Sequence, residues 1–252
     1  MPRFLLPMGK SSLALFLVIS LTLNFGCTPE APAGDEGPGQ TMSGTEAAGS
    51  THEELVDFFF AWREFQHPVM VDGVPDYTAD AMAARQRELA DWQARLAAFD
   101  TTGWSVTEQI DAHIIRAEMN GLEFDHRVTQ PWARNPAFYM MIHPAQSDVP
   151  AHEGPILYGW IDTWKYDYPL STDDAAELAQ RCGTIPAILD QARVNLVGNA
   201  RDLWRAGLRS MQGQIGNLTS YAEQVAGTSN ELDHNLQAAI GATEEFLAWL
   251  EE

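Results

Sequence analysis

Cysteine is almost absent from this sequence, which has two cysteines, Cys27 and Cys182, in 252 residues. Cys27 stands at the end of a predicted export signal, so Cys182 is the remaining cysteine of the exported part. No disulfide can then form within that part, and its fold must depend on a hydrophobic core. Cys182 itself falls on the apolar side of a predicted helix, and we interpret it as a core thiol rather than a nucleophile.

Long hydrophobic runs are also scarce. The extended run at 13–23 follows Arg3 and Lys10 and is roughly 11 to 15 residues long, whereas a membrane-spanning helix needs about 20. A basic start, a short apolar run and a small residue before a cleavage point are typical of a secretory signal. We therefore expect an exported protein and not an integral membrane protein.

Gly26 and Cys27 close this signal in the manner of a bacterial lipobox. Residues 1–27 are therefore predicted to be a lipoprotein-type signal peptide, with Cys27 acylated as the new amino terminus. Simple cleavage and secretion is the alternative. Thr28, rather than Asp, after the cysteine favours delivery to the outer membrane, so we expect a cell-envelope protein that faces the periplasm.

The predicted tether and the predicted domain follow the signal. Residues 28–50 consist mainly of Pro, Gly, Ser, Thr and acidic residues and have almost nothing to bury, which predicts a disordered tether. Residues 51–252 carry the apolar pattern of a folded domain. A tether after a lipid anchor would hold this domain near the membrane without inserting it.

Basic residues are few, since 15 Lys and Arg stand against 35 Asp and Glu, and the formal charge is −20. Two of the basic residues and none of the acidic ones precede residue 28, so removal of the signal would bring the formal charge to −22. Such a charge disfavours nucleic acids and anionic lipid surfaces as partners. The lipid anchor is therefore the one membrane contact that we expect.

Complete catalytic motifs are lacking as well. Residues 52–56, HEELV, are one side chain short of the zinc-peptidase pattern H-E-x-x-H, because Val56 stands where a second His is needed. Residues 152–156, HEGPI, fail because Pro155 prevents the helical turn that ligands at positions i and i+4 require. The sequence also has no G-x-S-x-G, Walker loop or G-x-G-x-x-G. We predict no catalytic residue and no metal site in this chain.

Helical periodicity dominates the sequence from Ser50 onward, and no strand pattern competes with it. We therefore predict an all-α fold, a multi-helix array. A capping box, Ser50 with Glu53, makes HEELV a helix start, and helices are also predicted to begin near Thr78, Ser105, Ser171 and Pro186. For the helix after Ser105, Asp111, Glu118 and Asp125 are expected on the solvated side, and the predicted buried face is Ile110, Ile114, Ala117, Gly121 and Phe124.

Residues 129–170 interrupt this regularity with six prolines and eight Trp, Tyr and Phe side chains. A long aromatic connection inside a helical domain is either a packed loop or a wall of a functional site, and both interpretations stay open here. If the segment is a functional wall, its candidate substrate-binding residues are Trp132, Arg134, Tyr139, His143 and His152.

The last predicted helix keeps its apolar phase up to residue 250 and ends on Glu251 and Glu252, where the helix dipole favours cations. No Gly cap or following Pro stops it. We expect the fold to continue beyond residue 252, so that this chain would be one incomplete half of a larger helical fold.

Six stretches carry a family resemblance, in this order along the chain: VDGVPDYTADAMAARQRELADWQARL, IDAHIIRAEMNGLEFDHRV, PWARNPAFY, SDVPAHEGP, GNARDLW and ATEEFLAWLEE. They resemble the amino-terminal part of the bacterial family called domain of unknown function 885 (DUF885). The resemblance implies a helical, gluzincin-like zinc metallopeptidase with a deep substrate channel. The H-E-x-x-H helix and the downstream Glu ligand of that family lie beyond the matched region, so zinc is expected only in the carboxy-terminal half absent from this sequence.

Two functions follow as alternatives. In the first, the chain is the amino-terminal helical portion of a cell-envelope metallopeptidase-like lipoprotein; it forms one wall of a channel for a peptide substrate and is inactive alone. In the second, it is a complete tethered helical module that binds a peptide, glycan or protein partner without catalysis. An isolated half should expose a large apolar patch and self-associate, whereas a finished module should be a monodisperse monomer.

Overall fold

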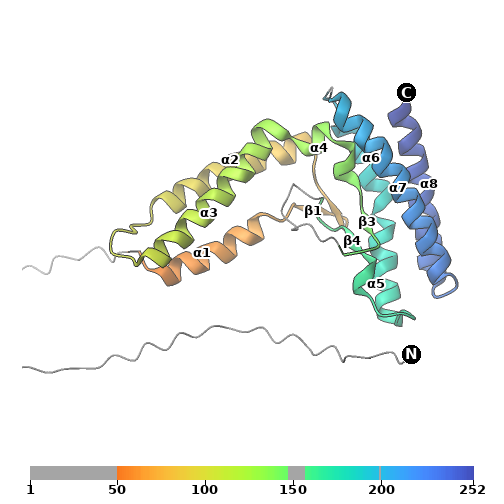
Figure 1. Cartoon of the computed structure of the whole chain (residues 1–252), viewed down its shortest axis with the longest axis horizontal. Helices are drawn as coiled ribbons and strands as arrows, with labels where there is room; N and C mark the ends of the chain where they lie inside the picture. Colours follow the sequence, from red (N-terminus) through yellow and green to blue (C-terminus); the bar gives the residue numbers. More distant parts are fainter. Residues whose placement is uncertain (1–49, 147–156, 199) are drawn as a thin grey trace, which may run out of the picture. The chain divides into compact units, whose positions relative to one another are not determined.

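The computed structural model describes residues 50–146, 157–198 and 200–252, all of which belong to one compact unit, Ala48–Glu252 (Figure 1). The predicted signal peptide with Cys27, nearly all of the predicted tether and His152 lie outside the described residues. The fold is all-α, as predicted from the periodicity. Its helices are α1 (His52–Phe65), α2 (Ala79–Ala97), α3 (Val106–Phe124), α4 (Pro131–Arg134), α5 (Thr172–Gly183), α6 (Ile185–Asn195), α7 (Arg201–Val225) and α8 (Asn230–Glu251).

Short strands and tight helical turns fill the connections. The pair β1 (Met70–Val71) and β2 (Val74–Pro75) is antiparallel, and the pair β3 (Ile142–His143) and β4 (Ile161–Asp162) is parallel. The segment after α3 forms a π-helical turn, Asp125–Thr129, then α4, then a 3₁₀ turn, Pro136–Tyr139. The sequence pattern missed these two-residue strands because they are too short to show alternation.

Two hydrophobic cores hold the helices together. The smaller core lies among α1, α2 and α3, where Trp62 and Met119 are fully buried. The larger core gathers α4 to α8 and the irregular segment. The helix α2 contributes to both, with Met82 in the larger core and Leu89 in the smaller one. The joint between the cores therefore runs along α2, and Figure 1 shows α1 to α3 side by side and α5 to α8 side by side.

Most predicted helix starts are confirmed. Ser105 with Glu108 forms a capping box on α3, and the Ser171 hydroxyl accepts a hydrogen bond from the Asp174 amide at the start of α5. The HEELV stretch is a helix start, but its capping box is Thr51 with Glu54 and not Ser50 with Glu53. The Ser50 hydroxyl instead accepts a hydrogen bond from the Asp100 amide at 3.2 Å. The N-cap residue of α1 is therefore one position later than predicted.

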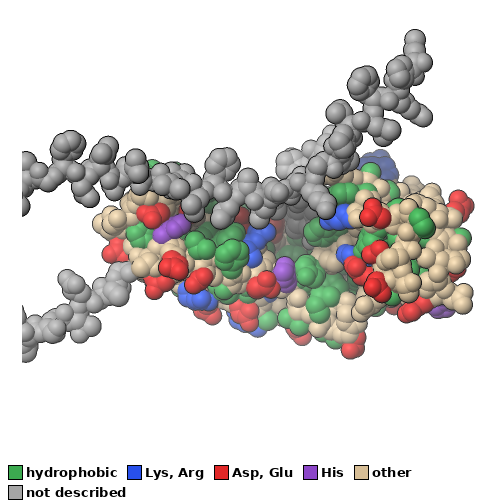
Figure 2. Space-filling view, turned by 90° about the horizontal axis from the view of Figure 1, so that it is seen from below, with side chains coloured by type: hydrophobic (Ala, Val, Ile, Leu, Met, Phe, Trp, Pro, Cys, Tyr) green, Lys and Arg blue, Asp and Glu red, His purple; other side chains and the backbone are tan. Residues whose placement is uncertain are grey.

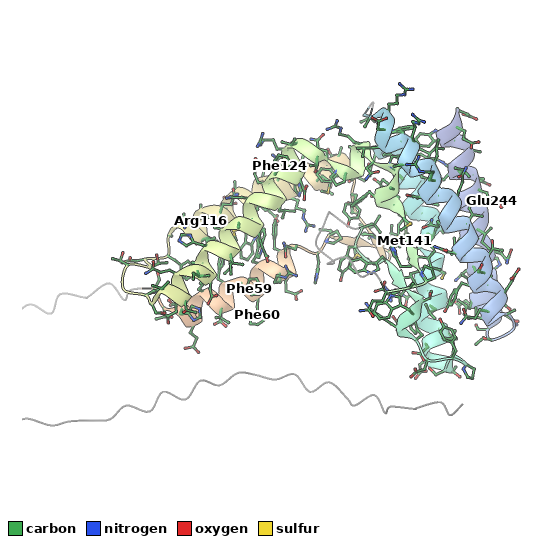
Figure 3. The ribbon with its side chains drawn as sticks, in the orientation of Figure 1. Phe59, Phe60, Arg116, Phe124, Met141 and Glu244 are labelled. Carbon is green, nitrogen blue, oxygen red and sulfur yellow. The ribbon has the colours of Figure 1, made fainter. Side chains whose placement is uncertain are left out.

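The helix α3 is apolar on two opposite sides, and the predicted buried side is wrong. Ala112, Ile115 and Met119, each at most 4% exposed, face the smaller core. Both sides repeat at steps of three and four, so periodicity alone cannot choose between them. The face predicted to be buried is exposed instead, with Phe124 labelled in Figure 3: Ile110, Ile114, Ala117, Gly121 and Phe124.

The acidic side of α3 reaches solvent, as predicted, and it also contacts α1. Asp111 lies 2.8 Å from Nε2 of His52, and Glu118 lies 3.3 Å from Nη1 of Arg63. These carboxylates therefore contact α1 while their side chains stay 45% and 37% exposed. They tie α3 to α1 at the two ends of their interface.

The helices α5 to α8 surround the larger core, and the burial predicted for Cys182 is confirmed. Leu178 and Cys182 are fully buried on α5, and burial raises the pKa of the Cys182 thiol to about 12, so the core-thiol interpretation is confirmed. The helix α8 packs against α5, α6 and α7. On α7, Gly207 lets Pro136 approach so closely that an added Cβ would lie 2.5 Å from the Pro136 Cβ. This contact docks the 3₁₀ turn onto α7.

Two surface properties bear on function. Of the helices in the described ranges, none is long and apolar enough to cross a membrane. Acidic side chains are scattered over the face shown in Figure 2, among patches of apolar side chains.

Candidate functional site

A cavity of about 520 Å³ lies where the two cores meet. Its walls come from the carboxy-terminal end of α1, the first turns of α2, the last turns of α3 and the irregular segment. Helix ends place charged and polar groups beside the apolar side chains of both cores there. This combination of an apolar wall with a few polar groups is the usual character of a ligand site.

Arg85 is the cationic group of this cavity. It lies three residues after Met82 and four before Leu89, so the periodicity of α2 turns its side chain inward. Its Nη2 donates to the carbonyls of Phe65, at 3.0 Å, and Gln66, and its guanidinium lies 5.3 Å from the Phe65 ring centroid. These contacts hold the cation at the carboxy-terminal end of α1, where the helix dipole favours positive charge.

Arg85 forms no ion pair within the described part of the chain, although the Glu88 carboxylate acts on its charge from farther away. Among the described residues, no Asp or Glu oxygen lies within 4.0 Å of it. Burial lowers its pKa, although a guanidinium stays protonated at neutral pH. The cavity therefore holds a half-buried positive charge whose hydrogen bonds within the described residues go to two backbone carbonyls.

His126 is the buried imidazole of the cavity, and it projects from the π-helical turn that follows α3. It is 2% exposed, and its ring lies 5.0 Å from that of Trp132. Its Nδ1 has no hydrogen-bond partner among the described residues. Burial first, and then the charge of Arg85, lower the pKa of His126 to about 4, so the ring is neutral at pH 7. Single π-helical turns inside helices are frequent at functional sites.

The other charged groups at the cavity are engaged. Glu118 pairs with Arg63, and an oxygen of Asp125 accepts from the Thr129 hydroxyl at 2.7 Å. Neither carboxylate competes for Arg85. Among the described residues, the charged or imidazole groups of the cavity that remain to bind a ligand are therefore those of Arg85 and His126.

Aromatic rings form the wall on the side of the larger core. Tyr77 and Phe138 meet edge to face with ring centroids 5.1 Å apart, and Trp132 lies beside His126. Buried hydrogen bonds fix this wall: Tyr139 donates to the Trp132 carbonyl at 2.6 Å, and Asn195 donates to the Tyr77 carbonyl at 2.9 Å. The rings are therefore held in place before any ligand arrives.

Four of the five residues predicted to bind substrate lie in the described part of the chain, and these four are dispersed. Trp132 lines the cavity, and Tyr139 lies fully buried beneath it, with its hydroxyl occupied by Trp132 and Asn195. Arg134 donates to the Val128 carbonyl at 3.0 Å and packs against Gly198, away from the cavity. His143 is half-buried in β3, where burial lowers its pKa, and it does not line the cavity.

Sequence reasoning missed Arg85 and His126. A signal was present for both: Arg85 is in phase with Met82 and Leu89, and His126 lies seven residues after Met119 on the buried side of α3. Charged or titratable residues in phase with a core face are candidates for buried polar roles. The wrong choice of the α3 face hid His126.

A second cavity, of about 710 Å³, is larger, but its charged side chains already have partners. Its ionic side chains pair with one another, Lys165 with Asp162 and Arg181 with Glu177. The Trp160 indole also donates to Asp162 at 3.0 Å. A ligand would have to displace these contacts, so the cavity at Arg85 is the better candidate.

The zinc site expected of the family does not fit the described residues. Within residues 50–146, 157–198 and 200–252, no three His, Cys, Asp or Glu side chains come together as metal ligands would. We therefore assign no metal-dependent step to these residues.

Comparison with known proteins gives the family. The family described as "Bacterial protein of unknown function (DUF885)" matches residues 66–252. The chain belongs to the DUF885 family. The resemblance predicted from the six stretches is thus confirmed, whereas the metallopeptidase activity that it implied stays a prediction.

A solved structure shares the fold of this DUF885 chain. It is described as "a putative lipoprotein of unknown function from Shewanella oneidensis", with 18% sequence identity and a TM-score of 0.51. The match covers 79% of this chain and 35% of that protein, so this chain spans about a third of its length. No curated protein matches this chain.

Proposed function

We propose that this chain is the amino-terminal, ligand-binding portion of a larger bacterial cell-envelope protein, and that the Arg85 cavity is part of the wall of a peptide-binding channel. The observation that supports this proposal is the cavity itself, where rigid aromatic rings line the same space as an arginine that forms no ion pair with a carboxylate of the described residues. Rings of this kind bind apolar side chains, and a guanidinium binds carboxylates or carbonyls. Peptides offer all of these groups.

The relation to a larger protein rests on two observations. The solved structure with the same fold is about three times as long as the matched region, judged by its 35% coverage. In addition, Val106, Ile110 and Ile114 are at least 49% exposed on the outer side of α3. An apolar stripe opposite a helix's core face is typical of a surface that another element covers. In this proposal the rest of a family-length protein covers it and supplies any catalytic groups, zinc included.

The envelope location rests on the sequence and on the description of the relative as a lipoprotein. In this proposal Cys27 is acylated and the anchored domain faces the periplasm from the outer membrane. Mass spectrometry of the purified protein should find an acylated Cys27 as its first residue. An unmodified amino terminus at or near residue 28 would support plain secretion instead.

The binding role is tested with two tryptophan variants of the chain without its signal. Trp132 lines the cavity, whereas Trp164 is 38% exposed and lines neither cavity. Calorimetric titration with a mixture of short peptides should show binding that Trp132→Ala abolishes and Trp164→Ala retains. Trp132→Phe, which keeps an aromatic ring, separates lost binding from lost folding.

The outcome that would contradict the proposal is equal peptide affinity in the Trp132→Ala and Trp164→Ala proteins, with both proteins folded by circular dichroism. The alternative, a finished binding module, would have the same cavity, but no further part of the protein would cover the apolar stripe on α3. Sedimentation of the isolated chain separates them, because an uncovered stripe should drive self-association that a finished module would not show.

A further inference from the structure

We infer that the Arg85 cavity binds an α-amido carboxylate, which is the chemical form of the carboxy-terminal residue of a peptide. This inference rests on the proposed function and makes it narrower. It assigns Arg85 to the carboxylate, His126 to the adjacent amide N–H, and the aromatic wall to the side chain.

The carboxylate assignment follows from the unused donors of Arg85. Its Nη2 is engaged by the two carbonyls at the end of α1, while Nε and Nη1 have no partner among the described residues. Each of these free N–H groups can donate one charge-assisted hydrogen bond to a carboxylate oxygen, and such bonds are about twice as strong as neutral hydrogen bonds. Because the carbonyls of Phe65 and Gln66 fix the guanidinium, little side-chain entropy is lost when a ligand binds.

The amide assignment follows from the neutral ring of His126. A neutral imidazole carries one N–H donor and one acceptor nitrogen. The Nδ1 atom has no hydrogen-bond partner among the described residues, and we assign it as the acceptor. An acceptor buried without a partner is unfavourable, and a ligand N–H would satisfy it. A plain carboxylate would leave Nδ1 unsatisfied.

The side-chain assignment follows from the wall. Tyr77, Trp132 and Phe138 present ring surface to the cavity, and their positions are fixed by buried hydrogen bonds and edge-to-face contacts. Aromatic and large aliphatic side chains gain most from such a surface. The cavity of about 520 Å³ has room for one such residue with its carboxylate and the preceding amide.

A purely structural role is the competing explanation for Arg85, since its Nη2 closes the end of α1. That role predicts that a variant loses stability. It does not predict that the variant changes its preference among ligands. The test therefore measures a ratio of affinities instead of a single affinity.

Three small probes separate the groups. N-acetyl-L-phenylalanine carries the carboxylate and the N–H, N-acetyl-L-phenylalaninamide lacks the carboxylate, and 3-phenylpropanoate lacks the N–H. Titrations followed by ¹H–¹⁵N spectra of the full chain without its signal should show the first binding best. We expect the amide to bind about tenfold more weakly, and the propanoate several-fold more weakly.

Variants assign these preferences to residues. Arg85→Gln should bring the ratio of carboxylate to amide affinity down to about 1, and Arg85→Lys should keep part of it. His126→Phe should remove the preference over 3-phenylpropanoate. Arg116→Gln is the control, because Arg116 is exposed on α3 and contributes the same charge away from the cavity (Figure 3). It should leave all ratios unchanged.

The outcomes separate this inference from the proposed function. If the wild type binds N-acetyl-L-phenylalanine and its amide equally, and Trp132→Ala abolishes both, the inference is overturned while the binding role stands. If Arg85→Gln keeps the full preference for the carboxylate, the inference is likewise overturned. If no probe and no peptide binds the wild type, both are overturned.

Discussion

The two cores of this chain differ in how completely their helices are covered. The helices α5 to α8 bury one face each in the larger core, and the predicted burial of Cys182 on α5 was correct. The helices α1 to α3 surround a smaller core and leave large apolar side chains exposed, among them Phe60 at 63% (Figure 3) and Ile114 at 52%. The first three helices therefore bury one apolar face in the smaller core and leave a second apolar face exposed. The cavity lies where this group of helices meets the larger core.

The largest expected effect tests whether the smaller core is a separate cooperative unit. Trp62 is fully buried at its centre, and Trp62→Ala should cost about 4 kcal/mol by lost burial and a cavity. Native-state hydrogen exchange should then show amide protection lost in α1 to α3 and kept in α5 to α8. Protection lost equally in both groups would show that the two cores unfold as one unit.

The folding stability should depend on pH through His126, which lies at the joint between the cores. The pKa of His126 is about 4 in the folded chain, against an ordinary value of 6.5, with Arg85 and Asp125 as its charged neighbours. Between these values the unfolded chain binds the proton more readily, so folding stability should fall as the pH drops from 6.5 to 4, by about 3 kcal/mol at most.

His126→Phe isolates that contribution, because all other acid-titrating groups remain. Urea unfolding at steps from pH 7 to pH 4 should show a shallower loss of stability in the variant than in the wild type. Parallel pH curves for the two proteins would mean that His126 is not buried as a neutral ring.

The two sides of α3 can be compared with neighbouring isoleucines. Ile115 is 4% exposed and Ile114 is 52% exposed. Ile115→Ala should cost about 2 to 4 kcal/mol in urea unfolding, whereas Ile114→Ala should stay within about 0.5 kcal/mol. Costs in the opposite order would restore the face that the sequence pattern predicted.

The smallest expected effect concerns α7, in the well-covered group. Gly207→Ala should cost about 2 kcal/mol, because the new Cβ would overlap Pro136. Gly213→Ala on the same helix meets no atom within 4 Å and should stabilise by up to about 1 kcal/mol through helix propensity. Melting temperatures that move the same way in both variants would argue against the close contact.

The sequence predicted local features well and contacts between distant segments poorly. Ser105 and Ser171 mark helix starts because capping depends on residues three apart. The buried face of α3 was mistaken because Ile114 and Ile115 belong to two equally regular stripes, and packing against α1 and α2 decides between them. The aromatic segment was recognised, but not that Tyr139 supports Trp132 from beneath.

The candidate site was half predicted. Trp132 was named from the aromatic segment, whereas Arg85 and His126 come from helices whose partners in the cavity lie far away in sequence. No pattern within α2 indicates that the end of α1 would receive the guanidinium. Such a site becomes visible only when the joint between the two cores is known.

The most direct test of the account is to locate the binding of N-acetyl-L-phenylalanine on the assigned ¹H–¹⁵N spectrum of the chain. The account predicts that the largest shifts fall on amides of α2 near Arg85, of the turn Asp125–Thr129 and of α4, at the joint between the cores. Shifts centred instead on the cavity at Arg181, or no shifts at all, would contradict it.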